Sequence, residues 1–186
     1  MGRWEPGARE RLAEAALELF LERGYDATTV ADIAARAGVT ERTFFRQYSD
    51  KREVLFGDPA EYNAVFTDAV AGAPADASPL DAGAAALRAV GAWFAGRHPY
   101  ARRRAAVVAA NPALQEREQV KRLHLTEAIA AALLARGAAQ PAAALTAELI
   151  SVAFHQAFVR WVAADEESDL GDLAISVLGE LRGLAR

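Results

Sequence analysis

The segment from Thr29 to Lys51, TVADIAARAGVTERTFFRQYSDK, constrains the fold of this chain more than any other feature. It contains two short runs of apolar residues at helical spacing, separated at Gly38, which permits a tight left-handed turn. Thr29 and Thr40 each stand where a side-chain oxygen caps the start of a helix. Two capped helices joined by such a turn are typical of a helix-turn-helix, whose second helix enters the major groove of DNA.

Helical patterns continue along the rest of the chain, and no segment has a credible strand pattern. We therefore predict an all-α fold of nine helices, with a three-helix N-terminal domain over 1–48 and a larger helical body over 49–186. The fourth helix is expected to begin at the Asp50-x-x-Glu53 capping box and to continue to about Val70. The other helices are expected at about 8–23, 29–37, 40–48, 80–97, 100–110, 112–136, 141–164 and 169–184.

Charge is unevenly distributed along the sequence. The whole chain has a net charge of −4, but the segment 36–52 has more basic than acidic residues. This positive segment coincides with the helix-turn-helix pattern, as expected for a surface that meets phosphates. Its charged residues are Arg36, Arg42, Arg46, Lys51 and Arg52 against Glu41 and Asp50.

The first turns of the second helix of the motif are expected to meet DNA. Arg42 and Arg46 share one face because they lie four residues apart, and arginine can grip guanine with two hydrogen bonds. Glu41 can accept a hydrogen bond from cytosine, while Phe44 and Tyr48 are better interpreted as core. The predicted DNA-binding residues are Thr29, Thr40, Glu41, Arg42, Thr43, Phe45, Arg46, Gln47 and Lys51. The alternative is that these side chains only face solvent and do not bind DNA.

The run LELFLERGYDATTVADIAARAGVTERTFFRQYSDKREVLF resembles the N-terminal domain of the TetR family of bacterial regulators. Phe45 and Gln47 depart from the family pattern, which commonly has tyrosine and histidine there. A weaker resemblance, carried by the run RTFFR, the later RRR and NPAL and the C-terminal RWV, is to an actinobacterial subgroup that includes regulators linked to mycofactocin gene clusters. The positions that fit the family pattern are Phe20, Gly24, Thr28, Thr29, Val30, Ile33, Ala34, Ala37, Gly38, Val39, Thr40, Thr43, Tyr48 and Lys51.

The family resemblance implies that the region 49–186 binds a small molecule and forms a homodimer. Aromatic residues in the body are candidates for the wall of an apolar pocket, although each of them can equally fill the core or a dimer interface. The predicted ligand-binding residues are Tyr62, Phe66, Trp93, Phe94, Phe154 and Phe158. We expect a hydrophobic effector, with an acidic or polar end as a further option. The arginines from Arg97 to Arg104 are either solvated or contact the DNA-binding domain or an anionic head group.

The last two helices are the best candidates for the dimer interface. Their apolar content exceeds what one small bundle needs, so they can form a four-helix interface with a second copy. The residues expected there are Leu149, Val152, Phe154, Leu173, Val177 and Leu181.

An all-α enzyme is the first alternative to a regulator. The acidic run Asp165, Glu166, Glu167 and Asp169 superficially resembles a magnesium motif of isoprenoid enzymes, but the chain has no second acidic motif. The three histidines lack metal-ligand spacing, and no nucleophile elbow or phosphate loop is present. We therefore expect no catalytic residue, no metal and no cofactor. A helical interaction module without DNA binding is the second alternative.

Cellular location is inferred from what the sequence lacks. The chain has no cysteine, no uninterrupted apolar run of membrane-spanning length and no apolar signal segment at its N-terminus. These features predict a cytoplasmic protein with no membrane partner. Together with the motif, they predict a homodimeric regulator, expected to be a repressor, that binds a near-palindromic double-stranded operator and responds to a small molecule.

Overall fold

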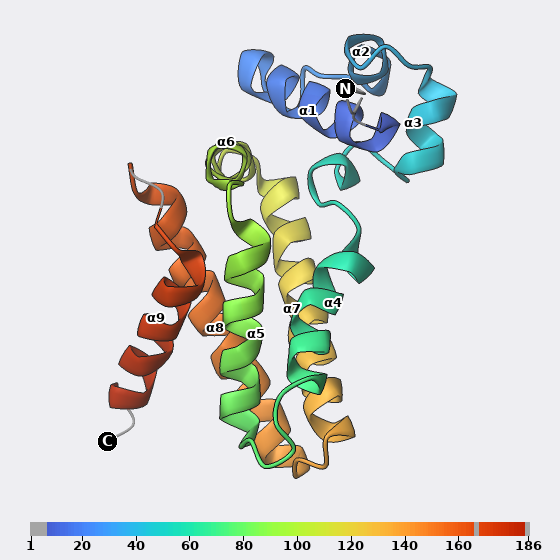
Figure 1. The fold of residues 1–186 in the computed structure, drawn as a ribbon. Helices are drawn as coiled ribbons and strands as arrows, with labels where there is room; N and C mark the ends of the chain where they lie inside the picture. The colour runs from blue at the N-terminus through green and yellow to red at the C-terminus, as the bar shows by residue number, and fades with distance from the viewer. Residues whose placement is uncertain (1–6, 166–167, 185–186) are drawn as a thin grey trace, which may run out of the picture. The chain divides into compact units, whose positions relative to one another are not determined.

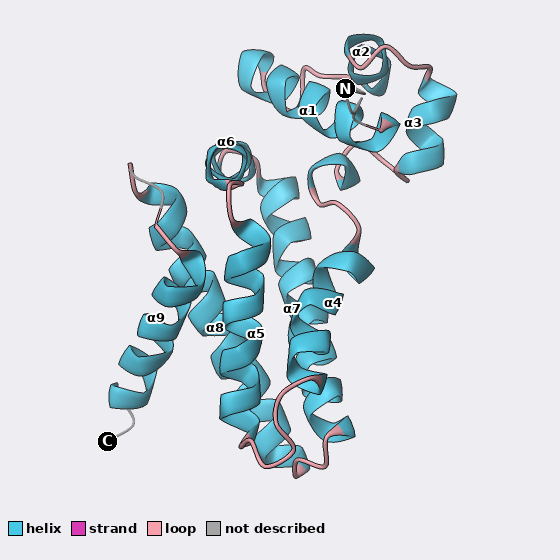
Figure 2. Cartoon of the chain, in the orientation of Figure 1, coloured by secondary structure: helices cyan, strands magenta, loops and turns pink. Residues whose placement is uncertain are grey.

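The computed structural model describes residues 7–165 and 168–184, and every regular element in these ranges is a helix (Figures 1 and 2). The predicted all-α class is confirmed. The elements are α1 (Ala8–Arg23), α2 (Val30–Arg36), α3 (Glu41–Gln47), the 3-10 helix η1 (Glu53–Leu55), α4 (Pro59–Ala71), α5 (Pro79–Phe94), α6 (His98–Ala109), α7 (Pro112–Ala135), α8 (Gln140–Ala163) and α9 (Leu170–Leu184).

The described residues form two compact units. The first unit comprises Met1–Gly57, as far as it is described, together with Arg103–Glu118. The second unit comprises Asp58–Arg102 and the described part of Gln119–Arg186. The first unit therefore extends past residue 48 and includes a segment, the end of α6 and the start of α7, that is distant in the sequence.

The predicted fourth helix from Asp50 to Val70 is wrong in its first third. The Asp50 carboxylate does accept from the backbone N–H of Glu53 at 3.2 Å, but only the short η1 follows, and its N-cap residue is Arg52. Gly57 then adopts a left-handed φ of 66°. Proline at 59 disfavours helical backbone in the residue before it, so the chain can resume a helix only at Pro59.

In the first unit, α1, α2 and α3 enclose a small core of fully buried side chains, among them Leu12, Ile33 and Phe44. The turn between α2 and α3 closes as a Schellman motif. Val39 N–H donates to the carbonyl of Ala34 at 2.9 Å, and Gly38, with a φ of 67°, donates to Ala35. This hydrogen bonding fixes the angle at which α3 leaves α2.

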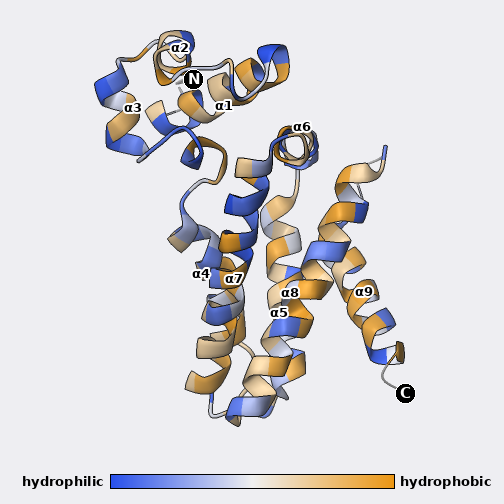
Figure 3. Cartoon of the chain, turned by 180° about the vertical axis from the view of Figure 1, so that it is seen from behind, coloured by the Kyte–Doolittle hydropathy of each residue, from blue (hydrophilic) through white to orange (hydrophobic). Residues whose placement is uncertain are grey.

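In the second unit, α5 packs against α4, α8 and α9. Its glycines allow two close approaches. A Cβ at Gly83 would lie 2.6 Å from the side chain of Ile150 on α8, and a Cβ at Gly91 would clash with the backbone of Gly171 on α9. The shared core of this unit includes Phe66, whose side chain is fully buried. Hydrophobic residues run along much of α8 and α9 in Figure 3.

Candidate DNA interface and effector region

Helix α3 presents most of the residues predicted to read DNA. Thr40 caps it by accepting from the N–H of Thr43 at 3.2 Å, and the two hydroxyls lie 3.1 Å apart. Phe44 packs inward and is fully buried, as predicted. Phe45 is 56% exposed, which is high for a large apolar residue, and its ring contacts that of Phe44. The exposed face of α3 consists of Glu41, Arg42, Phe45 and Arg46, with Thr43 and Gln47 half-exposed beside it.

The positive charge of segment 36–52 is concentrated in fewer residues than the sequence indicates. Arg36 is held by Glu18 and Glu22 at 3.1 and 2.9 Å, and Arg52 is paired with Asp50 at 2.9 Å. By contrast, Arg42 and Arg46 are exposed and form no ion pair with any described residue. These two guanidinium groups are therefore the ones available to an anionic partner of α3.

Thr29 is fully engaged as a helix cap. Its hydroxyl accepts from the backbone N–H of Asp32 at 3.1 Å and donates to the Asp32 carboxylate at 2.6 Å. The hydrogen bonds that the hydroxyl and the backbone N–H of Thr29 donate to the Asp32 carboxylate hold the pKa of Asp32 below its ordinary value. The backbone N–H of Thr29 also donates to the Asp32 carboxylate, at 2.9 Å, so a phosphate contact from Thr29 stays a prediction.

The side chain of Lys51 is turned toward the loop between α1 and α2. Its ammonium donates to the carbonyls of Tyr25 and Thr28 at 2.8 and 2.9 Å and lies 4.0 Å from the centre of the Tyr25 ring. Burial lowers the pKa of Lys51, against the opposing effect of the Asp26 carboxylate. In this arrangement Lys51 fastens the loop that leads into α2, whereas the sequence indicates a phosphate contact.

The arginines from 97 to 104 have separate roles, which the sequence did not reveal. Arg103 donates to the carboxylate of Glu14 on α1, both bonds being 2.9 Å long. Arg104 donates to the carbonyl of Leu55 at 2.7 Å. The contact of Arg103 with Glu14 bears out the option of contact with the DNA-binding domain over 1–48, whereas Leu55 lies outside that range. Arg102 instead donates to the exposed carboxylate of Asp165 at 3.2 Å, in the second unit.

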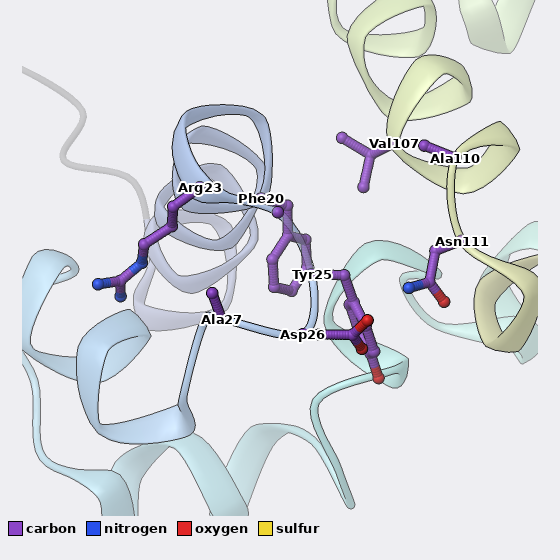
Figure 4. Close-up of a pocket in the computed structure, with 9 residues that line it drawn as sticks. Phe20, Arg23, Tyr25, Asp26, Ala27, Val107, Ala110 and Asn111 are labelled. Carbon is purple, nitrogen blue, oxygen red and sulfur yellow. The ribbon is translucent and has the colours of Figure 1, made fainter.

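A shallow hollow of about 320 Å³ lies in the first unit (Figure 4). Its walls come from the end of α1, the loop after it and the end of α6. None of the predicted ligand-binding residues belongs to it, so it is not the predicted effector pocket. The lining residues are Phe20, Arg23, Gly24, Tyr25, Asp26, Ala27, Val107, Ala110 and Asn111.

The second unit brings all six predicted ligand-binding residues together. Tyr62, Phe66, Trp93, Phe94, Phe154 and Phe158 form, with His98 and Trp161, a continuous set of ring contacts that we call the aromatic cluster. Phe66 is fully buried and Phe154 is 9% exposed, so these two belong to the core. The half-buried members, at the rim, are Tyr62, Trp93, Phe94 and Phe158.

Polar groups lie next to the aromatic cluster. His98 is buried, and its Nε2 is 2.9 Å from the carbonyl of Trp161. Asn63, the neighbour of Tyr62 on α4, has a buried Oδ1 with no hydrogen-bond partner among the described residues. Buried polar atoms normally have a partner, so this unpaired oxygen is an exception among the described residues.

The residues expected at the dimer interface differ in their burial. Leu149 is 37% exposed, whereas Val152, Leu173 and Leu181 are half-buried. Val177 is 2% exposed and Phe154 belongs to the aromatic cluster, so both pack inside their own chain and their assignment to an interface was wrong. The face of α8 that points away from this core instead exposes Leu145, Leu149 and Val159. The sequence pattern alone could not separate the two faces, because α8 is apolar nearly all round and long and apolar enough, by length and composition only, to cross a membrane.

The acidic run of the enzyme alternative falls partly outside the described residues, which exclude Glu166 and Glu167. Of its two described members, Asp169 accepts from the N–H of Asp172 at 2.8 Å at the start of α9. No group of three potential metal ligands occurs in the described ranges.

Residues 12–56 match the family model described as "Bacterial regulatory proteins, tetR family". The HTH-type transcriptional regulator TcmR of Streptomyces glaucescens is 43% identical over 82 residues, which are 44% of this chain and 36% of that protein. MftR of Mycobacterium tuberculosis, named for mycofactocin biosynthesis, is 36% identical over 58 residues, 31% of this chain and 29% of that protein. The matches thus span about a third of the lengths of these relatives.

Similarity over the whole chain is found at the level of structure. The regulator FadR of Bacillus subtilis, solved in complex with stearoyl-CoA, has a TM-score of 0.60 at 20% identity, and the alignment covers 92% of this chain and 96% of that one. This likeness shows that the helical body shares the fold of that regulator. Residues 12–56 are thus similar to the N-terminal domain of the tetR family, and the chain as a whole shares the fold of this solved regulator.

Proposed function

We propose that this chain is a cytoplasmic, homodimeric repressor that binds a near-palindromic operator through α3 and leaves it when a hydrophobic effector binds the second unit. The observation that carries the proposal is the exposed face of α3, where Arg42 and Arg46 have no acidic partner among the described residues. Arginine at this position reads guanine in the major groove, and each good two-pronged contact is worth roughly 1–3 kcal/mol.

The outer faces of α8 and α9 support a dimer. Leu145 and Val159 on α8 are 68% and 47% exposed, and such a row of exposed apolar residues on one helix face is costly in water. On α9, Ser176, Gly179 and Gly183 share an outward face, and a Cβ at either glycine would meet nothing within 4 Å. A second copy can therefore approach closely and cover the apolar row.

A dimer is required by the proposed mechanism. Two copies of α3 must meet successive major grooves on one side of the duplex, about 34–36 Å apart. The dimer has one state in which the spacing of the two α3 helices fits the DNA and another in which it does not. An effector lowers DNA affinity only if it binds the second state more tightly, and this difference in binding free energy is typically about 1–3 kcal/mol.

The aromatic cluster supports a hydrophobic effector. FadR of Bacillus subtilis, which shares the fold, was solved with stearoyl-CoA, a ligand with a long apolar tail. The half-buried rings at the rim of the cluster in this chain suit such a tail, because they offer apolar surface that is only partly covered by the protein.

Selection from a library of random duplexes tests the proposal. The wild-type protein should enrich a near-palindromic site, and its affinity for that site should fall steeply as salt rises. Arg42→Ala and Arg46→Ala should each relax the preference at particular base pairs. Arg122→Ala, which removes an exposed arginine from α7 in the second unit, is the matched control and should change nothing. If no sequence is enriched, the DNA-binding function is refuted.

A further inference from the structure

Two cations lie over the rim of the aromatic cluster. The guanidinium of Arg97 is 3.9 Å from the centre of the Trp93 ring, and the ammonium of Lys121 is 4.0 Å from the centre of the Tyr62 ring. The two rings touch edge to face with centres 5.9 Å apart. Tyr62 on α4, Trp93 on α5, Lys121 on α7 and Arg97 at the end of the loop before α6 thus place two positive charges over two adjoining rings of the second unit.

The surroundings of these rings change from charged to apolar over a short distance. Tyr62 also contacts Phe66 at 5.5 Å and Phe154 at 6.5 Å between ring centres. Phe66 is fully buried, so the path from Lys121 across Tyr62 to Phe66 leads from solvent into the core. An amphipathic molecule matches this gradient, with its head at the cations and its tail against the rings.

The stacked geometry leaves the guanidinium of Arg97 able to bind an anion. A guanidinium that stacks on a ring uses its flat face, so its N–H donors, which lie in the plane, remain directed to the side. Arg97 forms no ion pair within the described residues, in contrast to Arg103 and Arg104, which are both paired with glutamates. Of the arginines between 97 and 104, Arg97 is therefore the one suited to a ligand.

We infer that Arg97 and Lys121 bind the anionic head group of the effector, and that this effector is an organic anion with an aliphatic tail and a carboxylate or phosphate head. The inference rests on the proposed function, because it assigns a ligand class to the effector region. Charged hydrogen bonds to such a head add affinity that a neutral molecule with the same tail cannot obtain.

The test measures the affinity of the full chain for decanoate, decyl phosphate and 1-decanol by calorimetry. These probes share one tail and differ in the head, so the two anions distinguish a carboxylate site from a phosphate site. In the variant Arg97→Gln/Lys121→Gln we expect the affinity for the preferred anion to fall by about 5- to 20-fold, given the partial exposure of the site. The affinity for decanol should change by less than about twofold. Arg122→Gln, next to Lys121 on α7, is the control for charge alone.

Three results would contradict the inference, and each has a different meaning. Equal losses for anions and decanol would show that the two cations only support the fold, and losses in Arg122→Gln as large as in the double variant would show a general charge effect. Either result overturns the inference but leaves a hydrophobic effector in place. Failure of the wild-type protein to bind any of the three probes overturns the anion site and the hydrophobic effector together, while the operator selection independently decides the DNA-binding function.

Discussion

Arg117 on α7 and Glu53 in η1 form a two-pronged ion pair although they lie 64 residues apart in the sequence. Their side chains are only 19% and 22% exposed. The hydrogen bond to Glu53 raises the pKa of Arg117 above its ordinary value. The guanidinium also lies 5.5 Å from the ring centre of Phe56, and that of Arg104 lies 4.8 Å from the same ring. Segment 103–118 is therefore an integral part of the first unit.

We expect Glu53→Gln to destabilise the first unit by about 1–3 kcal/mol, because it leaves a largely buried guanidinium without its counter-charge. Urea unfolding followed by circular dichroism measures the change. The ion pair of Arg102 and Asp165 provides the control, because it is exposed: the side chain of Asp165 is 94% exposed. Asp165→Asn should cost at most about 0.5 kcal/mol. Equal effects of the two substitutions would contradict the structural role of the Glu53 pair.

Lys51→Ala separates a role in the fold from a role in DNA binding. The substitution leaves the carbonyls of Tyr25 and Thr28 without their donor, so we expect a loss of about 1–2 kcal/mol in the free energy of unfolding. The dependence of operator affinity on salt should stay unchanged. If Lys51 contacts a phosphate instead, the slope of log affinity against log salt will decrease by about 0.9, since one contact fewer releases counterions.

Two substitutions to aspartate distinguish the dimer interface from the core. Leu149→Asp changes a residue that is 37% exposed on the outer face of α8, so we expect folded monomers that do not bind the operator. Val177→Asp buries a carboxylate inside the second unit, where Val177 is 2% exposed, and should unfold it. Sedimentation and circular dichroism report the two outcomes. A dimer that survives Leu149→Asp would place the interface elsewhere.

Asn63→Leu tests whether the buried amide is kept for a ligand. Its Oδ1 has no partner within the described residues, and replacing an unsatisfied buried polar group by an apolar one of similar shape removes a desolvation penalty. We expect the ligand-free protein to gain about 1 kcal/mol, or about 2–4 °C in melting temperature for a chain of this size. The effector response should weaken at the same time. A fall in melting temperature would show that Asn63 already has a partner, such as water.

Local features of the helix-turn-helix were predictable from sequence, since their causes lie within a few residues. Thr29 and Thr40 cap helices because their hydroxyls reach backbone amides three residues away, and Gly38 takes the left-handed conformation that the turn requires. The break before α4 was equally local, in Gly57 and Pro59, but the capping signal at Asp50 masked it. Local sequence therefore determined α2, α3 and the turn between them.

Only the tertiary structure decided which side chains are available to partners. Arg36, Arg42 and Lys51 are equivalent as charges in the sequence. Folding pairs the first with glutamates from α1, leaves the second exposed, and turns the third onto backbone carbonyls. In the same way α8 is apolar on nearly all sides, and its packing on α5 and α9 decided that Phe154 is core and Leu149 is surface. Hydrophobicity and charge are properties of a single residue. Ion pairing and burial depend instead on tertiary contacts with residues that are distant in the sequence.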